Sequence, residues 1–98
     1  MKYQLLVRPE AQQDLAEAVR WYEEKQTGLG RGFLLRIHEA MNGIIRNPHK
    51  HAVIHRDVRR SFTRRFPYGI FYRMVGQTIV VLGVFHARRD PGRWQSRT

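Results

Sequence analysis

The sequence predicts an α+β fold in which a helical hairpin packs on one face of a mainly antiparallel, four-stranded sheet. Two patterns support this expectation. Apolar residues recur at helical spacing in two segments of the first half, and apolar runs separated by turn signals fill the second half. The expected order is strand, helix, helix, strand, strand, strand. A chain of 98 residues can build one hydrophobic core, so residues 1–98 are expected to form a single domain.

The first strand and the first helix occupy the opening residues. Residues 3–7 form a short apolar run, and Pro9 suits the first position of a helix. The apolar positions of this helix follow helical spacing: Ala11, Leu15, Ala18, Val19 and Tyr22. Its charged positions are expected to face solvent: Glu10, Asp14, Glu17, Arg20, Glu23 and Glu24.

A second helix follows a break at residues 27–30 and ends at Asn47-Pro48. Its apolar face consists of Phe33, Leu34, Ile37, Ala40, Met41, Ile44 and Ile45. Because the break is short, the two helices are expected to form an antiparallel hairpin.

Three strands are expected after a loop at residues 49–57, at residues 58–66, 68–74 and 79–86. Gly76 suits the first central position of a type II′ turn between the last two strands. The three strands form a meander, and the first strand joins its edge. The helices then cover one face, and the other face stays open as a binding surface lined by aromatic residues and arginines.

Composition excludes several classes of protein. The hydrophobic fraction of 42% argues for a folded chain, and the absence of cysteine excludes both disulfides and a thiolate zinc site. The longest uncharged stretch, residues 74–85, is shorter than the ~20 residues that span a membrane. We therefore expect a soluble, cytoplasmic protein without membrane contact.

Positive charge is concentrated in the second part of the chain. The net charge is +10, and residues 31–98 carry fourteen basic and three acidic side chains. Fifteen of the eighteen basic residues are arginine, and three Arg-Arg pairs occur, at 59–60, 64–65 and 88–89. Arginine binds phosphate and carboxylate groups through two parallel hydrogen bonds. The pattern therefore favours recognition of an anionic partner over a merely solvated surface.

The last two strands should gather this charge at one place. One arginine cluster, residues 64–68, precedes the first strand of the hairpin, and the other, residues 86–94, follows the second strand. A hairpin brings the start of one strand beside the end of the next. We expect one cationic end that suits a phosphate backbone or an acidic protein segment.

One stretch of the sequence runs from Arg64-Arg65-Phe66-Pro67-Tyr68 through Arg73, and a second is Val84-Phe85-His86-Ala87-Arg88-Arg89-Asp90-Pro91-Gly92-Arg93-Trp94. Both stretches resemble the RelE/ParE family of type II toxin–antitoxin toxins. The resemblance covers nearly the whole chain and is closer to the ParE-like branch. It implies a small basic toxin, encoded beside an acidic antitoxin that wraps and neutralises it in a hetero-oligomeric complex. It also implies growth inhibition and a role in plasmid stabilisation.

Two activities occur in that family: ribosome-dependent cleavage of messenger RNA, and inhibition of DNA gyrase. RNA cleavage needs groups that exchange protons with the 2′-hydroxyl and the leaving oxygen. After Glu39 this chain offers no glutamate and one lysine, Lys50, and residues 87–98 contain no tyrosine. The sequence therefore favours a gyrase inhibitor without chemistry of its own. An mRNA endonuclease and a basic nucleic-acid-binding module remain the alternatives.

Candidate site residues come from the two stretches that carry the resemblance. For target binding they are Arg64, Arg65, Arg73, His86, Arg88, Arg89, Arg93 and Trp94. No catalytic residue, cofactor or metal is assigned. If the protein is a ribonuclease, Arg65, Arg73 and His86 are the catalytic candidates, with Tyr72 as a further possible participant.

For several other residues, both a functional and a structural role are considered. His49, His51 and His55 could supply imidazole ligands to a metal, but a mobile polar loop explains their spacing as well. His86 could exchange protons, although a hydrogen bond from the end of its strand to a neighbouring loop is favoured. Trp94 is expected to anchor the C-terminal tail on the sheet, and Asp90-Pro91 to form a turn in which Asp90 pairs with an arginine.

Overall fold

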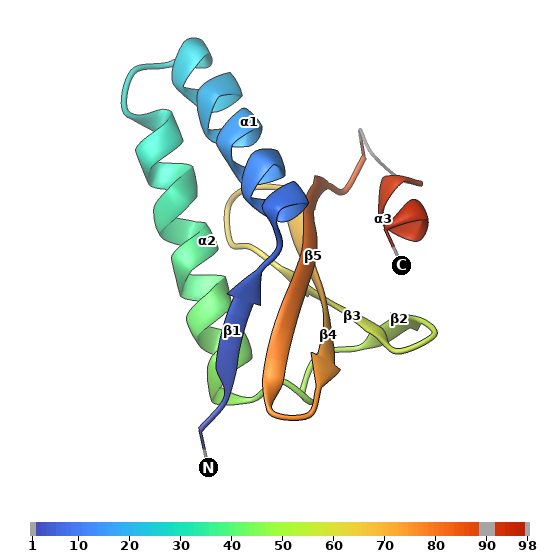
Figure 1. Cartoon of the computed structure of the whole chain (residues 1–98). Helices are drawn as coiled ribbons and strands as arrows, with labels where there is room; N and C mark the ends of the chain where they lie inside the picture. Colours follow the sequence, from blue (N-terminus) through green and yellow to red (C-terminus); the bar gives the residue numbers. More distant parts are fainter. Residues whose placement is uncertain (1, 89–91, 98) are drawn as a thin grey trace.

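The computed structural model describes residues 2–88 and 92–97 (Figure 1). Two long helices lie side by side on one face of a sheet with strand order β1-β5-β4-β3-β2. The elements in chain order are β1 (Gln4–Val7), α1 (Pro9–Lys25), α2 (Leu29–Arg46), β2 (Val53–His55), β3 (Val58–Phe62), β4 (Tyr68–Val75), β5 (Thr78–His86) and α3 (Arg93–Ser96). The predicted α+β fold and its helical hairpin are confirmed. Within the described residues, no helix is both long and apolar enough to cross a membrane.

The connection between α1 and α2 is fixed by glycine and by one carboxylate. Gly28 precedes α2 with φ of 89°, a left-handed conformation that glycine adopts at little cost. The carboxylate of Glu23, on α1, accepts the backbone N–H groups of Gly28 at 2.9 Å and Gly30 at 3.0 Å. These N–H groups lie at the start of α2, where a helix has no backbone partner for them. Glu23 therefore caps α2 from the neighbouring helix.

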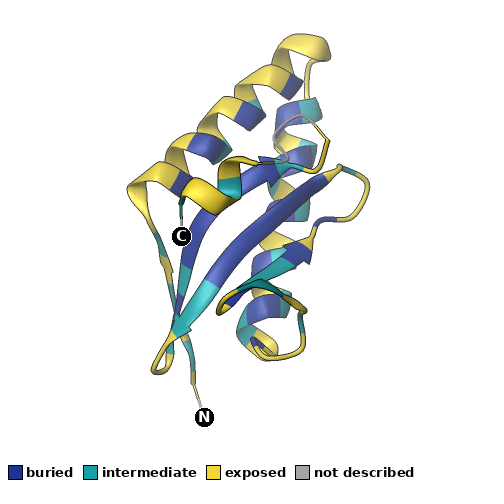
Figure 2. Cartoon of the chain, turned by 90° about the vertical axis from the view of Figure 1, so that its right-hand side faces the viewer, coloured by how far each residue is buried: buried dark blue, intermediate teal, exposed yellow. Residues whose placement is uncertain are grey.

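The main core lies between the helices and the sheet. Each long helix turns a buried stripe toward the strands, and its outer side is exposed (Figure 2). The buried residues of this core are Ala11, Ala18, Tyr22, Phe33, Ile37, Met41, Ile44, Tyr68, Ile70, Tyr72, Ile79, Val81 and Val84. Burial of each large apolar side chain contributes about 1.5–3 kcal/mol relative to exposure, so this face dominates the stability of the fold.

The meander of β3, β4 and β5 is antiparallel, and β1 joins its edge in parallel with β5, as predicted for the edge strand. Val75 pairs with Thr78 across a two-residue turn, in which Gly76 has φ of 60°. Gln77 does not share this left-handed conformation. A positive φ at only the first central residue is the type II′ pattern, which confirms that prediction.

The sheet has five strands, and the prediction of four was wrong. The segment expected to be a loop contains β2, which pairs with β3 through Val53 and Arg59. The backbone N–H of Arg60 also donates to the carbonyl of Ala52 at 3.2 Å. Arg56 turns the chain between these strands with φ of 52°. This short hairpin lacks the glycine that usually marks such a turn, so its sequence gave little sign of it.

Strand β3 is shorter than predicted, because the connection to β4 begins at Thr63. The backbone N–H of Thr63 donates to the carbonyl of Tyr68 at 3.0 Å, and the Thr63 hydroxyl donates to the carbonyl of Phe66 at 2.7 Å. Arg65, in the middle of this loop, has φ of 70°. Residues 63–67 therefore form a tight turn in place of the last residues of the expected strand.

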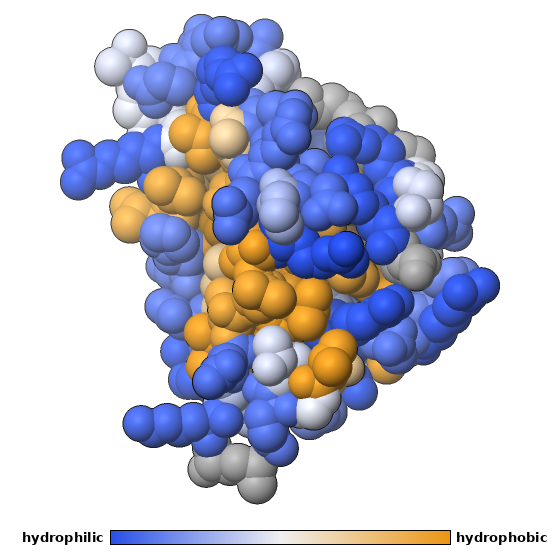
Figure 3. Space-filling view, viewed as in Figure 1, coloured by the Kyte–Doolittle hydropathy of each residue, from blue (hydrophilic) through white to orange (hydrophobic). Residues whose placement is uncertain are grey.

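The second face of the sheet is not left open as expected. A smaller cluster there consists of Val58, Phe71, Leu82 and Phe85, with Ile54, Val80 and Trp94 packed against it. The short helix α3 brings Trp94 onto this cluster. Beyond it, an apolar patch remains at the surface over β1 and β5, where Leu6 is 55% exposed beside Val80 (Figure 3). The C-terminal residues thus close part of a face that the strand pattern alone leaves bare.

Candidate functional site

Two arginine-bearing loops meet at one end of the β4–β5 hairpin. Tyr68, the first residue of β4, pairs with His86, the last residue of β5, and the backbone N–H of Ala87 donates to the carbonyl of Pro67 at 2.7 Å. The loop with Arg64 and Arg65 therefore lies beside the segment that contains Arg88, and all three arginines are exposed. We call these three residues the basic end. The prediction that the hairpin joins the two clusters is confirmed.

Part of the second cluster lies outside the described residues. Arg89, Asp90 and Pro91 belong to this part, so the structure does not test the predicted turn or the predicted pairing of Asp90.

A shallow groove runs between α2 and the β3–β4 connection, and we call it the α2 groove. It consists of two hollows of about 410 and 560 Å³, which share Arg36 and Glu39. Arg46 and Arg64 line one hollow, and Arg65 lines the other. The apolar lining comes from Leu29, Leu35, Ala40, Phe62 and Phe66. Exposed arginines beside apolar side chains suit a partner segment that is both acidic and amphipathic.

Arg36 forms an ion pair with Glu39 at 3.1 Å one turn further along the helix. The contribution of α2 to a charged groove depends on the long-range position of the β3–β4 loop. Only the fold brings that loop against the helix.

Arg73 does not lie at the basic end. It pairs with Val80 near the opposite end of the hairpin, five residues from Tyr68, which corresponds to ~16 Å along a strand. Its guanidinium forms an ion pair with Asp57 at 3.4 Å. The structure therefore does not bring Arg73 together with Arg65 and His86, the other two residues named for a ribonuclease.

His86 ends β5 and forms a hydrogen bond to a neighbouring loop, which is the role that the sequence favoured over proton exchange. Its Nδ1 accepts the backbone N–H of Arg88 at 3.0 Å, and its ring lies edge-on to Tyr68 with centroids 5.3 Å apart. The hydrogen bond to the following loop is confirmed. It fixes the imidazole beside the basic end.

Tyr72 is a structural residue, which corrects its place among the possible catalytic groups. The side chain is fully buried, and its hydroxyl donates to the carbonyl of Pro48 at 2.7 Å. Burial raises the pKa of Tyr72 to about 12, although nearby Arg59 acts in the opposite direction. A phenol in this state neither reaches a substrate nor exchanges a proton at neutral pH.

The three histidines of the predicted loop lie in different surroundings. His49 lies edge-on to Tyr3, His51 to Tyr72, and His55 to Trp94. Burial, together with the nearby charges of Lys50 and Arg59, lowers the pKa of His51. Within the described residues, no group of three histidine, cysteine or acidic side chains could hold a metal ion.

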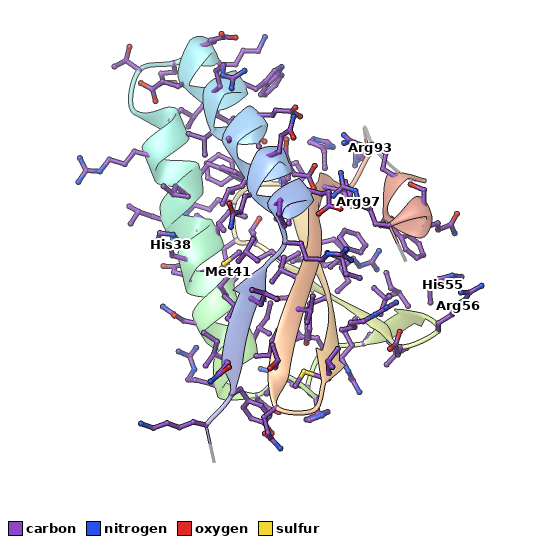
Figure 4. The ribbon with its side chains drawn as sticks, viewed as in Figure 1. His38, Met41, His55, Arg56, Arg93 and Arg97 are labelled. Atoms are coloured by element: carbon purple, nitrogen blue, oxygen red, sulfur yellow. The ribbon has the colours of Figure 1, made fainter. Side chains whose placement is uncertain are left out.

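His55 lies in a strand and not in the loop that was expected at residues 49–57. It ends β2, and its side chain lies beside Arg56 at the β2–β3 turn (Figure 4).

The buried carboxylate of Asp14 is the clearest feature that was not predicted from the sequence. We call Asp14 and its two partners, Val84 and Arg97, the Asp14 clamp. Asp14 was expected to face solvent but is only 7% exposed. It accepts the backbone N–H of Val84 at 3.1 Å and both terminal nitrogens of Arg97, at 2.8 and 3.0 Å. Hydrogen bonding to Asp14 raises the pKa of Arg97 further. Figure 4 shows Arg97 reaching from the C-terminal segment toward α1.

The Asp14 clamp exists because β1 is short. The pairing of β1 with β5 ends at Val81, so the next backbone groups on that edge of β5 have no strand beside them. Asp14 takes the N–H of Val84, and Arg97 donates to the carbonyl of Leu82 at 3.1 Å. The ion pair thus replaces the missing strand.

Arg93 and Trp94 are held against the protein. The Arg93 guanidinium lies 3.6 Å from Asp14 and 5.1 Å from the centroid of the Phe85 ring. Its side chain is 50% exposed, so Arg93 contacts Asp14 and Phe85 while part of it remains at the surface. Trp94 stacks on Phe71 with centroids 5.7 Å apart and ring planes at 14°. The predicted anchoring of the tail by Trp94 is confirmed.

Solved structures with a similar fold come from toxin–antitoxin systems. A chain of the chromosomal ParDE toxin–antitoxin system from P. aeruginosa matches with a TM-score of 0.78 and 18% identity, over 87% of this chain and 96% of that chain. A chain of the toxin–antitoxin complex RelBE2 from Mycobacterium tuberculosis matches with a TM-score of 0.63 and 21% identity, over 88% of this chain and 99% of that chain. Among proteins with curated descriptions, none matches the sequence.

These likenesses show that the protein shares its α+β fold with both of those chains. The sequence profile of the ParE toxin of the type II toxin–antitoxin system, parDE, matches residues 5–91. The chain belongs to this family of ParE toxins. The resemblance to the RelE/ParE family, and to its ParE-like branch, is therefore confirmed.

Proposed function

We propose that this protein inhibits growth by binding DNA gyrase, without a chemical reaction of its own. One observation carries the proposal. Cations gather at the basic end, whereas Arg73 lies far along the hairpin from His86, and Tyr72 is buried in the core. Among the described residues, His86 is the one ribonuclease candidate that lies beside Arg65 at the basic end, and its Nδ1 accepts the backbone N–H of Arg88, so binding is the activity that this arrangement favours. Membership of the ParE family supports the same reading.

We also propose that a cognate acidic antitoxin neutralises the toxin by occupying the α2 groove. The groove offers Arg36, Arg46, Arg64 and Arg65 beside exposed Leu35. An amphipathic segment with carboxylates along one side complements such a lining. The similar chains of known structure come from a ParDE system and a RelBE2 toxin–antitoxin complex, which supports an antitoxin partner for this chain.

The function is tested with purified gyrase and, separately, with translating ribosomes. We expect inhibited supercoiling and accumulation of cleaved DNA in the gyrase assay, and no codon-positioned cuts in messenger RNA. Prior addition of the antitoxin should abolish the gyrase effect. Ribosome-dependent cuts with unaffected gyrase would overturn the proposal and would make the mRNA endonuclease the better reading.

A further inference from the structure

One hollow of the α2 groove contains a cluster of polar side chains, and we call it the Ser61 hollow. It has a volume of about 410 Å³ and lies between α2, the loop that follows α2, and the end of β3. Its lining includes Asn42 and Arg46 from α2, His51 from the loop, Ser61 from β3, and Arg64 from the β3–β4 connection. The hollow therefore offers several hydrogen-bond donors at one place.

The hydroxyl of Ser61 is the feature that points to a ligand. Ser61 is only 4% exposed, although it lines the hollow. Within the part of the chain that the structure describes, its hydroxyl forms no hydrogen bond. Buried hydroxyl groups are usually hydrogen-bonded, because an unpaired one has lost its bonds to water without replacement. A buried, unpaired hydroxyl that faces a hollow therefore indicates that an acceptor binds there.

Positive charge approaches the hollow from two elements. The guanidinium of Arg46 lies beside Gly43, since a β-carbon added to Gly43 would be 3.7 Å from Nη2 of Arg46. Arg64 adds a second guanidinium from the β3–β4 connection. Among the described residues, neither Arg46 nor Arg64 forms an ion pair, whereas Arg36 pairs with Glu39 at 3.1 Å. Two guanidinium groups are therefore available to a carboxylate, which arginine binds through charge-assisted hydrogen bonds.

His51 borders the hollow from a loop that the sheet holds in place. Arg59 donates hydrogen bonds to the carbonyl oxygens of His49 at 3.1 Å and of His51 at 2.7 Å. Tyr72 donates to the carbonyl of Pro48, and its ring lies edge-on to the imidazole of His51 with centroids 6.3 Å apart. The position of this imidazole is therefore set before a ligand arrives.

The groups around His51 are mostly cationic. Burial and the charges of Lys50 and Arg59 lower the pKa of His51, so the imidazole is neutral at pH 7 in the free protein. Tyr72, with a pKa of about 12, is neutral as well. A carboxylate in the hollow acts in the opposite direction and favours the protonated imidazole. The charged groups that border this loop and the hollow are Lys50 on the loop, Arg59 on β3, Arg46 and the paired Arg36 and Glu39 on α2, and Arg64 on the β3–β4 connection.

The surroundings favour a carboxylate over a phosphate. Glu39 lines both hollows of the α2 groove, and its charge repels a doubly charged phosphate about twice as strongly as a singly charged carboxylate. The neighbouring hollow is lined by Leu29, Leu35 and Phe66, which suit an apolar side chain. A peptide segment with a carboxylate and an apolar side chain fits both hollows, whereas a phosphate fills only the first.

We propose that the Ser61 hollow binds one carboxylate of the antitoxin and that His51 takes up a proton as it does so. Arg46 and Arg64 form charged hydrogen bonds with this carboxylate, and the Ser61 hydroxyl donates another. The protonated imidazole of His51 completes the site. This inference rests on the proposed occupation of the α2 groove by an acidic antitoxin, and it adds a specific contact and a dependence on pH.

The direction of the pH effect follows from the protons that each state holds. The complex holds the His51 proton more tightly than the free protein does, so binding strengthens as the pH falls through the pKa of His51 in the complex. The effect levels off below the pKa of His51 in the free protein, which lies below the ordinary value of about 6.5. Peptide glutamates, with a pKa of about 4.3, stay ionised at pH 5.5. Acidification from pH 8 to pH 5.5 therefore strengthens the complex.

Isothermal titration calorimetry of the full chain with synthetic peptides tests the proposal. The acidic peptide repeats glutamate, two alanines and leucine over about sixteen residues, which places glutamates and leucines on adjacent stripes of a helix. A control peptide has glutamine in place of glutamate, and inorganic phosphate is the third probe. We expect the acidic peptide to bind about tenfold more tightly at pH 5.5 than at pH 8, with uptake of up to about one proton. The control peptide and phosphate should bind more weakly at both pH values.

Two variants with matched controls separate the subsite from general attraction. His51→Gln should abolish the pH dependence, whereas His38→Gln, at an exposed position on α2, should retain it. Arg46→Gln should weaken binding of the acidic peptide about tenfold, because a charged hydrogen bond is lost. Arg31→Gln removes the same charge from another exposed position on α2 and should have a much smaller effect.

Ser61→Ala distinguishes a binding role from a structural one. Because the hydroxyl has no hydrogen bond to the described part of the free protein, its removal should not lower the thermal midpoint. The same substitution should weaken binding of the acidic peptide about tenfold, as is typical for loss of a hydrogen bond to a charged group.

Four results would overturn the inference: equal binding at the two pH values, pH dependence that persists in His51→Gln, unchanged binding by Ser61→Ala, or tighter binding of phosphate than of the acidic peptide. If one of these occurs while Arg46→Gln still weakens binding more than Arg31→Gln, the subsite fails and the acidic partner in the α2 groove stands. If the acidic peptide does not bind at all, both fail. The gyrase assay decides the inhibitory function independently of these measurements.

Discussion

Asp14 shows how a single residue can hold two distant parts of the chain. Its carboxylate receives hydrogen bonds from β5 and from Arg97, which is 83 residues away in the sequence. A buried charge of this kind is tolerated because several donors surround it. Removal of the carboxylate would leave Arg97 and the N–H of Val84 without their acceptor in a place that water reaches poorly.

We predict that Asp14→Ala lowers the free energy of unfolding by about 3–5 kcal/mol, because it breaks a buried ion pair from one side. Urea denaturation measures this loss. Glu17→Ala is the matched control, since Glu17 is exposed on the same helix and its removal should change stability by no more than about 0.5 kcal/mol. Equal effects of the two substitutions would contradict the structural role of the Asp14 clamp.

Tyr72 gives a second prediction, on the effect of pH. Its pKa of about 12 lies above the usual value of about 10, so the folded state holds the phenol proton more tightly than the unfolded chain. The stabilisation is therefore complete below pH ~10 and is lost as the pH rises toward 12. Tyr72→Phe should be less stable by about 1 kcal/mol at neutral pH, because the hydrogen bond to Pro48 is gone.

Urea denaturation of the two proteins at a series of alkaline pH values provides the measurement. The stability advantage of the parent over Tyr72→Phe should shrink between pH ~10 and 12. Profiles that stay parallel over this range would show that burial does not hold the phenol in its neutral form.

The burial of Asp14 could be predicted only in part. Asp14 lies on the same helical stripe as Ala11, Ala18 and Tyr22, so the spacing itself contained a sign of its burial. The sign was outweighed because aspartate is rarely buried without a partner. The partner, Arg97, follows the last strand near the C-terminus, and no local pattern connects it with α1.

At the scale of elements, α1 and α2 approach each other closely at one glycine. A β-carbon on Gly30 would lie 2.6 Å from the carbonyl oxygen of Val19. The oxygen belongs to the backbone of α1, so it cannot move without moving that helix. Gly32 lies two residues further along α2, which is about half a helical turn, and has nothing within 4 Å of an added β-carbon.

We predict opposite effects for alanine at these two glycines. Gly30→Ala should cost about 1–3 kcal/mol, because the helices must separate. Gly32→Ala should add about 0.5–1 kcal/mol, because alanine favours a helix more than glycine does. Thermal midpoints and urea titrations of both variants provide the comparison. Stabilisation by both substitutions would contradict the close packing of α1 on α2.

The order of elements followed from sequence patterns because each pattern is local. Helical spacing, Pro9, Gly76 and the Asn47-Pro48 stop signal all act within a few residues. The missed elements depend on long-range contacts. Strand β2 forms because β3 offers it an edge, and α3 is held by Trp94 on Phe71 and by Arg97 on Asp14. Sequence patterns do not contain such contacts.

At the scale of the whole molecule, charge and stability are largely separated. The large core lies between the long helices and the sheet, whereas Arg64, Arg65 and Arg88 are exposed at one end of the hairpin. The basic end could be predicted from the sequence, because the pairing of two consecutive strands places the two arginine-bearing loops together. The sequence did not predict that Arg73 lies near the other end or that Arg93 contacts Asp14. Those positions depend on strand register and on the path of the tail.

The central claim is that the basic end carries toxicity without carrying the fold, and one comparison tests it most directly. Growth inhibition and thermal stability are measured for Arg64→Ala/Arg65→Ala/Arg88→Ala and for Arg8→Ala/Arg20→Ala/Arg31→Ala, which removes the same charge elsewhere. Loss of an exposed charge costs no more than about 0.5 kcal/mol of stability each. Truncation of a charge buried at an interface commonly costs ~2–5 kcal/mol of binding. We expect the first variant to stay folded and lose toxicity, and the second to keep both. A first variant that is folded and fully toxic would contradict the account.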